Sequence, residues 1–128
     1  MSRPGLMTDT RLAGPIIESP AAENLSGHKA VAIVGGQAVL ADFSTTAHRG
    51  LVRGITTGAI ASGETARVQV YGPLREPGWS WTAGLPIYVG SNGTLTQSAP
   101  TSGWLQQIAV ADTATQIFID PQPVFVLV

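Results

Sequence analysis

The sequence has no cysteine, two histidines and few charges. Without cysteine, disulfide bonds and thiolate metal sites are excluded. Only 12% of the residues are charged, the net charge is −1, and Lys29 is the single lysine. No basic stripe is present to neutralise nucleic-acid phosphates, so we expect no nucleic-acid partner.

Long apolar runs are also missing. No run reaches the roughly 18 apolar residues that a membrane-spanning helix needs. The N-terminus lacks the apolar stretch of a secretory signal. We therefore expect a protein that is made in the cytoplasm and has no membrane partner.

The residues that are present favour an all-β fold. The chain is 44% hydrophobic and contains 15 glycines and 9 prolines, and from Gly27 onward short runs of Val, Ile and Thr alternate with turn residues. This pattern is typical of a compact β-sandwich or a partly open β-barrel. The expected strands are Lys29–Val34, Ala38–Asp42, Gly50–Thr57, Ala66–Tyr71, Leu85–Val89, Thr94–Gln97, Leu105–Ala111, Gln116–Ile119 and Val124–Leu127.

These strands fall into two similar sets. The segments that align are Val34–Leu40 with Val89–Leu95, Gly50–Ile55 with Gly103–Ile108, and Arg67–Val70 with Gln116–Ile119. The offset falls from 55 to 53 to 49 residues, as loop deletions between equivalent strands would produce. The sequence therefore predicts two four-stranded units, at about 27–72 and 82–121, followed by a C-terminal strand at 123–128. Glycines at 35, 36 and 93 predict tight hairpins.

Residues 1–25 precede these units and show no regular period. We expect them to form an extended arm before a single β domain of residues 26–128. Two interpretations remain open: a free terminus, or an arm that lies on a neighbouring subunit. The short apolar group Pro15, Ile16 and Ile17 favours the second.

The last strand is apolar on both faces. Val124, Val126 and Val128 alternate with Phe125 and Leu127. Such a strand is either central in a sheet or covered by another subunit, because exposed apolar edges promote aggregation. We therefore expect a homo-oligomer.

Residues that could carry catalysis are scarce. Asp42, His48 and a nearby hydroxyl such as Ser44, Thr45 or Thr46 could be drawn as a triad, but hydroxyls are common in β-rich loops. We expect His48 to cap its loop instead. The sequence has no P-loop, no zinc-protease motif and no nucleophile elbow. It therefore predicts no enzyme activity, no cofactor and no metal site.

Trp79 and Trp81 share one face of an extended segment because they are two positions apart. Paired indoles can serve as a stacking platform for a sugar, or they can pack against a core or a subunit boundary. Only Glu76, Ser80 and Thr82 offer polar groups nearby. We favour packing as a plug.

Five motifs follow one another along the chain from Asn24 to the C-terminus. They are Gly54–Thr56, Ala61–Val70, Trp81–Tyr88, Asn92–Thr96 and Ile108–Ala111. Their order resembles that in the capsid decoration (cement) proteins of tailed bacteriophages and in related head-fibre or tail-fibre modules.

The resemblance implies a non-enzymatic virion protein, usually trimeric, on the outer surface of an assembled capsid, with the major capsid protein as its partner. The alternative is a receptor-binding or glycan-binding fibre module, with Trp79, Trp81 and Trp104 as stacking candidates. The arm and the closing segment from Ile119 depart from the pattern, so the mode of attachment stays open. Candidate contacts with the capsid or another subunit are Pro15, Ile16, Ile17, Trp79, Trp81, Phe125 and Leu127.

Overall fold

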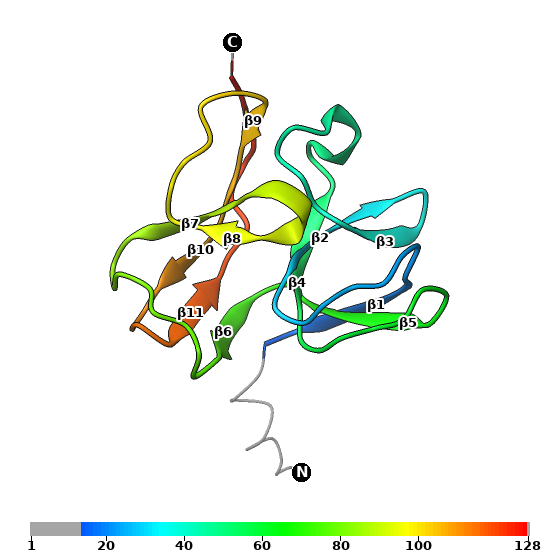
Figure 1. Ribbon diagram of the computed structural model, residues 1–128, viewed down its shortest axis with the longest axis horizontal. Helices are drawn as coiled ribbons and strands as arrows, with labels where there is room; N and C mark the ends of the chain where they lie inside the picture. The colour runs from blue at the N-terminus through cyan, green and yellow to red at the C-terminus, as the bar shows by residue number, and fades with distance from the viewer. Residues whose placement is uncertain (1–13, 128) are drawn as a thin grey trace, which may run out of the picture.

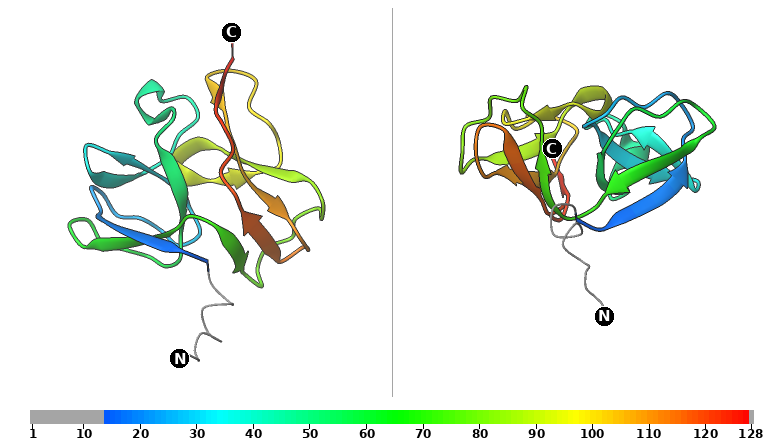
Figure 2. Two further views of the ribbon diagram at one scale, coloured as in Figure 1. Left: turned by 180° about the vertical axis from the view of Figure 1, so that it is seen from behind. Right: turned by 90° about the horizontal axis from the view of Figure 1, so that it is seen from below.

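The computed structural model describes residues 14–127, which form antiparallel strands and two short 3-10 turns (Figure 1). The strands make two five-stranded sheets and one two-stranded ribbon. The two sheets form two halves of the molecule that meet along its middle (Figure 2). The all-β prediction is confirmed, and the arrangement is compatible with a sandwich. The described residues form no closed barrel.

The first sheet holds the first half of the chain. It contains β1 (Ile16–Pro20), β2 (Ala30–Val34), β3 (Gln37–Leu40), β4 (Val52–Thr56) and β5 (Thr65–Gln69). Their order across the sheet is β1-β5-β4-β2-β3, and the pairs are antiparallel.

The second sheet holds β6 (Gly72–Arg75), β7 (Pro86–Val89), β8 (Leu95–Thr96), β10 (Gln107–Ala111) and β11 (Gln116–Ile119). Their order is β6-β11-β10-β7-β8. The ribbon consists of β9 (Trp104–Leu105) and β12 (Phe125–Val126).

The two sheets have the same topology. If β1 to β5 are matched in turn with β6, β7, β8, β10 and β11, one strand order becomes the other. The predicted duplication is therefore present, but each unit has five strands rather than four. The missed strands, β1 and β6, contain Pro20, Gly72 and Pro73, residues that are depleted in strands. They are accommodated because both strands lie at sheet edges.

One of the three alignments between the units is out of register. Ile55 pairs with Gln69, and Val110 pairs with Phe118. Gln69 and Phe118 correspond in the third alignment, so Ile55 corresponds to Val110, at an offset of 55. When the first alignment is continued back along β2 and β7, Val31 corresponds to Pro86, and their partners Gly54 and Val110 then correspond at an offset of 56. Both offsets differ from the expected 53, and both the β2–β4 and the β7–β10 pairs contain a register shift. Alternation in the sequence does not reveal such shifts.

The turn after β2 and the equivalent turn after β7 differ from each other in length. Gly35 and Gly36 have φ values of 59° and 79° and form the expected two-residue hairpin. Asn92 and Gly93 also have positive φ, but they lie in a five-residue loop, Gly90–Thr94. The Gly90 N–H donates to the Thr94 carbonyl at 2.7 Å to close this loop. The prediction of a tight hairpin at Asn92 and Gly93 is therefore wrong.

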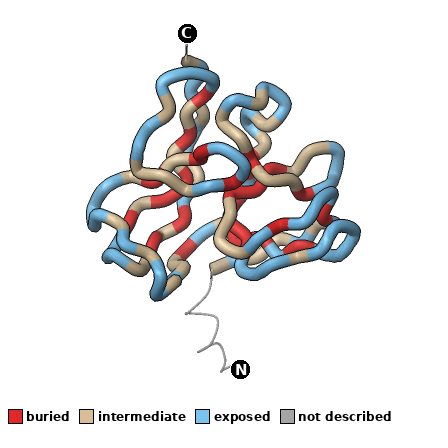
Figure 3. The backbone as a smooth tube through the Cα atoms, in the orientation of Figure 1, coloured by how far each residue is buried: buried red, intermediate tan, exposed pale blue. Residues whose placement is uncertain are grey.

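Buried residues occur in both halves of the molecule (Figure 3). Their apolar side chains form two clusters that hold the fold together. The larger cluster joins the two sheets, and the smaller one lies within the first unit. The larger includes Ala30, Ala32, Val52, Ile55, Ile87, Val89, Ile108, Ile117 and Ile119. The smaller contains Ala21, Leu25, Val31, Ala38, Ala66 and Val68. The first sheet is therefore covered on both faces.

The predicted arm ends earlier than residue 25. Strand β1 pairs with β5 over its whole length, and Ala21 and Leu25 are buried in the smaller cluster. Ile17 packs against the same cluster, so its contacts lie within its own chain. Residues 14–25 thus belong to the β domain, while residues 1–13 and Val128 lie outside the described part. The apolar pair in β1 was too short to be recognised as a strand.

Candidate functional site

The C-terminal ribbon is the most exposed apolar feature of the described chain. The segment after β11 stays beside the preceding strands: the Asp120 N–H donates to the Ile108 carbonyl and the Gln122 N–H to the Gln107 carbonyl. Strand β12 then pairs with β9. The ribbon extends beyond both sheets, at the top of Figure 1.

Both residues of β12 are open to solvent. Phe125 is 61% exposed and Val126 is 54% exposed, although adjacent residues of a strand point to opposite faces. No charged residue occurs from Pro121 to Leu127. The strand is therefore not central within its own chain, and the expectation that another subunit covers it stays a prediction.

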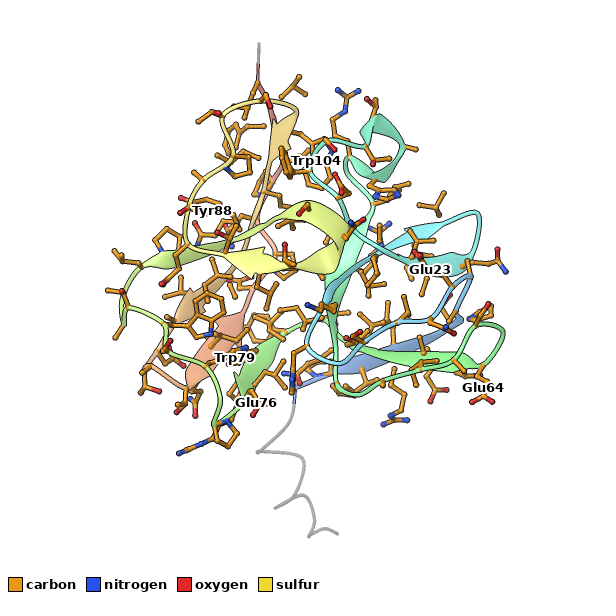
Figure 4. All side chains as sticks on the ribbon, viewed as in Figure 1. Glu23, Glu64, Glu76, Trp79, Tyr88 and Trp104 are labelled. Atoms are coloured by element: carbon orange, nitrogen blue, oxygen red, sulfur yellow. The ribbon has the colours of Figure 1, made fainter. Side chains whose placement is uncertain are left out.

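The base of the ribbon is firmly anchored. Trp104 is 2% exposed, and its Nε1–H donates to the Thr45 carbonyl at 2.9 Å (Figure 4). Its backbone N–H donates to the Phe43 carbonyl at 3.1 Å. Trp104 is thus a buried anchor and offers no open face for stacking on a sugar.

Trp79 and Trp81 lie in the connection between β6 and β7. This connection crosses the end of the β10–β11 hairpin, where the Glu76 N–H donates to the Thr115 carbonyl and the Trp81 N–H to the Ala114 carbonyl. Both indoles pack against the larger cluster.

The first unit contains the same arrangement. After β1, the Ala21 N–H donates to the Glu64 carbonyl and the Leu25 N–H to the Ile60 carbonyl, both in the β4–β5 connection. Leu25 fills the smaller cluster from this position. Trp81 therefore corresponds to Leu25, and its packing fits the plug interpretation.

The two indoles do not form a flat platform. Their ring centroids are 5.7 Å apart and their planes are inclined by 57°. A shallow pocket of about 240 Å³ is lined by Gly78, Trp79, Ser80 and Trp81. The Nε1 of Trp81 is buried and has no hydrogen-bond partner among residues 14–127.

A contact that the sequence did not predict joins the first unit to this connection. His28 has a φ of 59°, and its Nδ1 lies 3.3 Å from Glu76 Oε2. The imidazole meets Trp79 edge-on, with centroids 5.2 Å apart. The Gly78 N–H donates to Glu76 Oε1 at 3.1 Å. No local pattern signals such a contact, because its partners lie far apart in the sequence.

Asp42 and His48 do not form a triad. The Asp42 N–H donates to His48 Nδ1 at 3.1 Å, so the imidazole caps its loop as predicted. The carboxylate instead accepts the N–H groups of Ser44, at 2.8 Å, and Asn92, at 3.0 Å. Burial raises the pKa of Asp42, but the hydrogen bonds from Ser44 and Asn92 outweigh it and lower the pKa below its usual value.

Residues 14–127 contain no group of three His, Asp or Glu side chains that could hold a metal ion. No helix in this range is long and apolar enough to cross a membrane. No protein-family model matches the sequence, and no curated protein matches it significantly. We therefore infer the function from the geometry of residues 14–127 and from the order of the motifs.

Proposed function

We propose that the protein is a virion structural protein that binds the outer surface of an assembled phage capsid as a homo-oligomer and stabilises it without catalysis. The observation that carries this proposal is the β9–β12 ribbon. It projects from the fold, exposes Phe125 and Val126, and is held at its base by the buried Trp104. Exposed apolar surface on a rigid support is typical of a protein contact.

The resemblance to decoration proteins supports the choice of a capsid as partner. A protein that binds only the assembled shell stabilises that shell by mass action. Several linked copies strengthen the attachment without a tight single contact. The proposal needs no catalytic group, and the carboxylate of Asp42 and the imidazole of His48 are both engaged in holding a loop.

Binding to expanded capsids that lack a decoration protein tests the proposal. We expect the purified chain to co-sediment with such capsids, to saturate at a copy number fixed by the lattice, and to raise their disruption temperature. Phe125→Ser should weaken binding, whereas Tyr71→Ser should not, although Tyr71 is also exposed. Failure of the oligomer to bind any expanded capsid would contradict the proposal.

A receptor-binding or glycan-binding fibre module is the second candidate. The pocket beside Trp79 and Trp81 favours it, but the 57° inclination of the rings does not suit a flat sugar platform. A glycan array separates the two functions. Binding that Trp79→Ala abolishes without loss of the oligomer would support the fibre module, whereas loss of the oligomer would support packing.

A further inference from the structure

One edge of β12 carries backbone groups that no described strand satisfies. Phe125 lies opposite Leu105, and the Leu127 N–H donates to the Gly103 carbonyl. Hydrogen-bonded and non-hydrogen-bonded pairs alternate along an antiparallel ladder. The N–H and C=O of Phe125 therefore point toward β9.

The neighbouring residues point the other way. By the same alternation, the N–H and C=O of Val124 and Val126 face away from β9. The N–H of Trp104, opposite Val126, agrees with this because it donates to Phe43 and not to β12. No described strand pairs with this side of β12, because the ribbon consists of β9 and β12 alone.

This edge carries no charge and no proline of its own. Natural edge strands are protected by short length, charged side chains, proline or a bulge. Strand β12 is short and follows Pro123, but residues 124–127 contain no charge and no proline. Outward N–H and C=O groups in alternation are complementary to another β-strand rather than to a helix or a small ligand.

We propose that the free edge of β12 pairs with the same edge of a second copy, antiparallel and about a two-fold axis. Val124 of one copy then lies opposite Val126 of the other, which gives four hydrogen bonds. Phe125 faces its counterpart as a non-hydrogen-bonded pair. Such a contact is self-complementary, and the uncharged strands bring no like charges together.

This pairing deepens the proposed function, because it specifies how copies of the chain associate. It differs from the trimer that the resemblance implies, so the number of chains distinguishes the two. The second copy is preferred over an unrelated strand because the two edges match each other in length, hydrogen bonding and lack of charge.

A single cysteine tests the register, because the chain has none of its own. Residues in a non-hydrogen-bonded pair have Cα atoms about 4.5 Å apart, within the range of a disulfide. Phe125→Cys should form a disulfide-linked species of two chains under mild oxidation. Tyr71→Cys, which is also exposed but lies far along the chain, should not. Equal cross-linking of both variants would overturn the pairing.

Val126→Pro tests whether the backbone groups that face away from β9 make the contact between the two copies. Proline removes only an outward N–H, so β12 keeps its bonds to β9 while losing the free edge. By sedimentation equilibrium, the wild type and Val126→Leu should have the mass of two chains, and Val126→Pro the mass of one. Circular dichroism establishes that each variant is folded.

Different results would contradict the two-fold pairing and the capsid-binding function. A wild-type mass of one or three chains would overturn the two-fold pairing, and a trimer that still binds capsids would leave the proposed function intact. A two-chain protein that fails to bind expanded capsids would contradict the capsid function alone.

Discussion

The side chain of Asp42 links the two halves of the molecule through a hydrogen bond. Its carboxylate accepts the N–H of Ser44 from its own loop and the N–H of Asn92 from the second unit. Phe43 adds a bond in the same place, because its N–H donates to the Gly90 carbonyl at 3.2 Å. The loop after β3 is therefore tied to the second unit by charge-assisted and backbone bonds.

These bonds make stability depend on pH. The pKa of Asp42 is lowered in the folded state, so its contribution is present above the unfolded value of about 3.9 and is lost as the pH falls through the lower folded value. We expect Asp42→Asn to lower the free energy of unfolding by about 1 kcal/mol at neutral pH, with the difference vanishing in acid. Urea unfolding across the pH range measures this. Asp120→Asn is the control, and the same pH dependence in that variant would contradict the assignment.

Trp79 and Trp81 show how far the role of a residue can be predicted from its local sequence. The spacing of Trp79 and Trp81 allowed a platform or a plug, and nothing local could decide between them. The structure shows the inclined rings and the match of Trp81 with Leu25. The match depends on hydrogen bonds to hairpins more than thirty residues away, so it could not be predicted from the local sequence.

At the scale of strands, alternation identified nine of the elements to within a few residues. It failed where strands contain Gly or Pro, as in β1 and β6, and where β9 and β10 are separated at Gln106. The errors at β1 and β6 share a physical cause: edge strands tolerate residues that central strands exclude. Packing partners, rather than the local sequence, decide whether such segments form strands.

Gly54 is a central-strand position where glycine is required. A Cβ on Gly54 would overlap the carbonyl of Gln69 on the neighbouring strand. We expect Gly54→Ala to lower the free energy of unfolding by about 3 kcal/mol, at the upper end of overpacking costs. Gly58→Ala is the matched control, because nothing lies within 4 Å of its added Cβ, and it should change stability by less than about 0.5 kcal/mol. Equal effects in urea unfolding would contradict the close approach of β4 and β5.

At the scale of the molecule, the duplication could be found in the sequence, but the way its two copies depend on each other could not. The larger cluster combines Ala30, Ala32 and Ile55 of the first unit with Ile87 and Ile117 of the second. The contact between His28 and Glu76 crosses the same boundary. Each unit therefore completes its burial only in the presence of the other.

This shared burial predicts a single unfolding transition. All three tryptophans lie in the second half of the chain, after residue 78, and two of them touch the first unit at the boundary, Trp79 through His28 and Trp104 through Thr45. Their fluorescence therefore reports on the second unit and on this boundary, while far-ultraviolet circular dichroism reports on both units. Leu25→Ala, in the cluster confined to the first unit, should lower the free energy of unfolding by about 3 kcal/mol. It should shift the fluorescence and dichroism midpoints in urea equally, because a two-state protein unfolds as a whole. A fluorescence midpoint that stays in place while the dichroism midpoint moves would show that the units unfold independently. The two sheets would then be separate domains rather than halves of one fold.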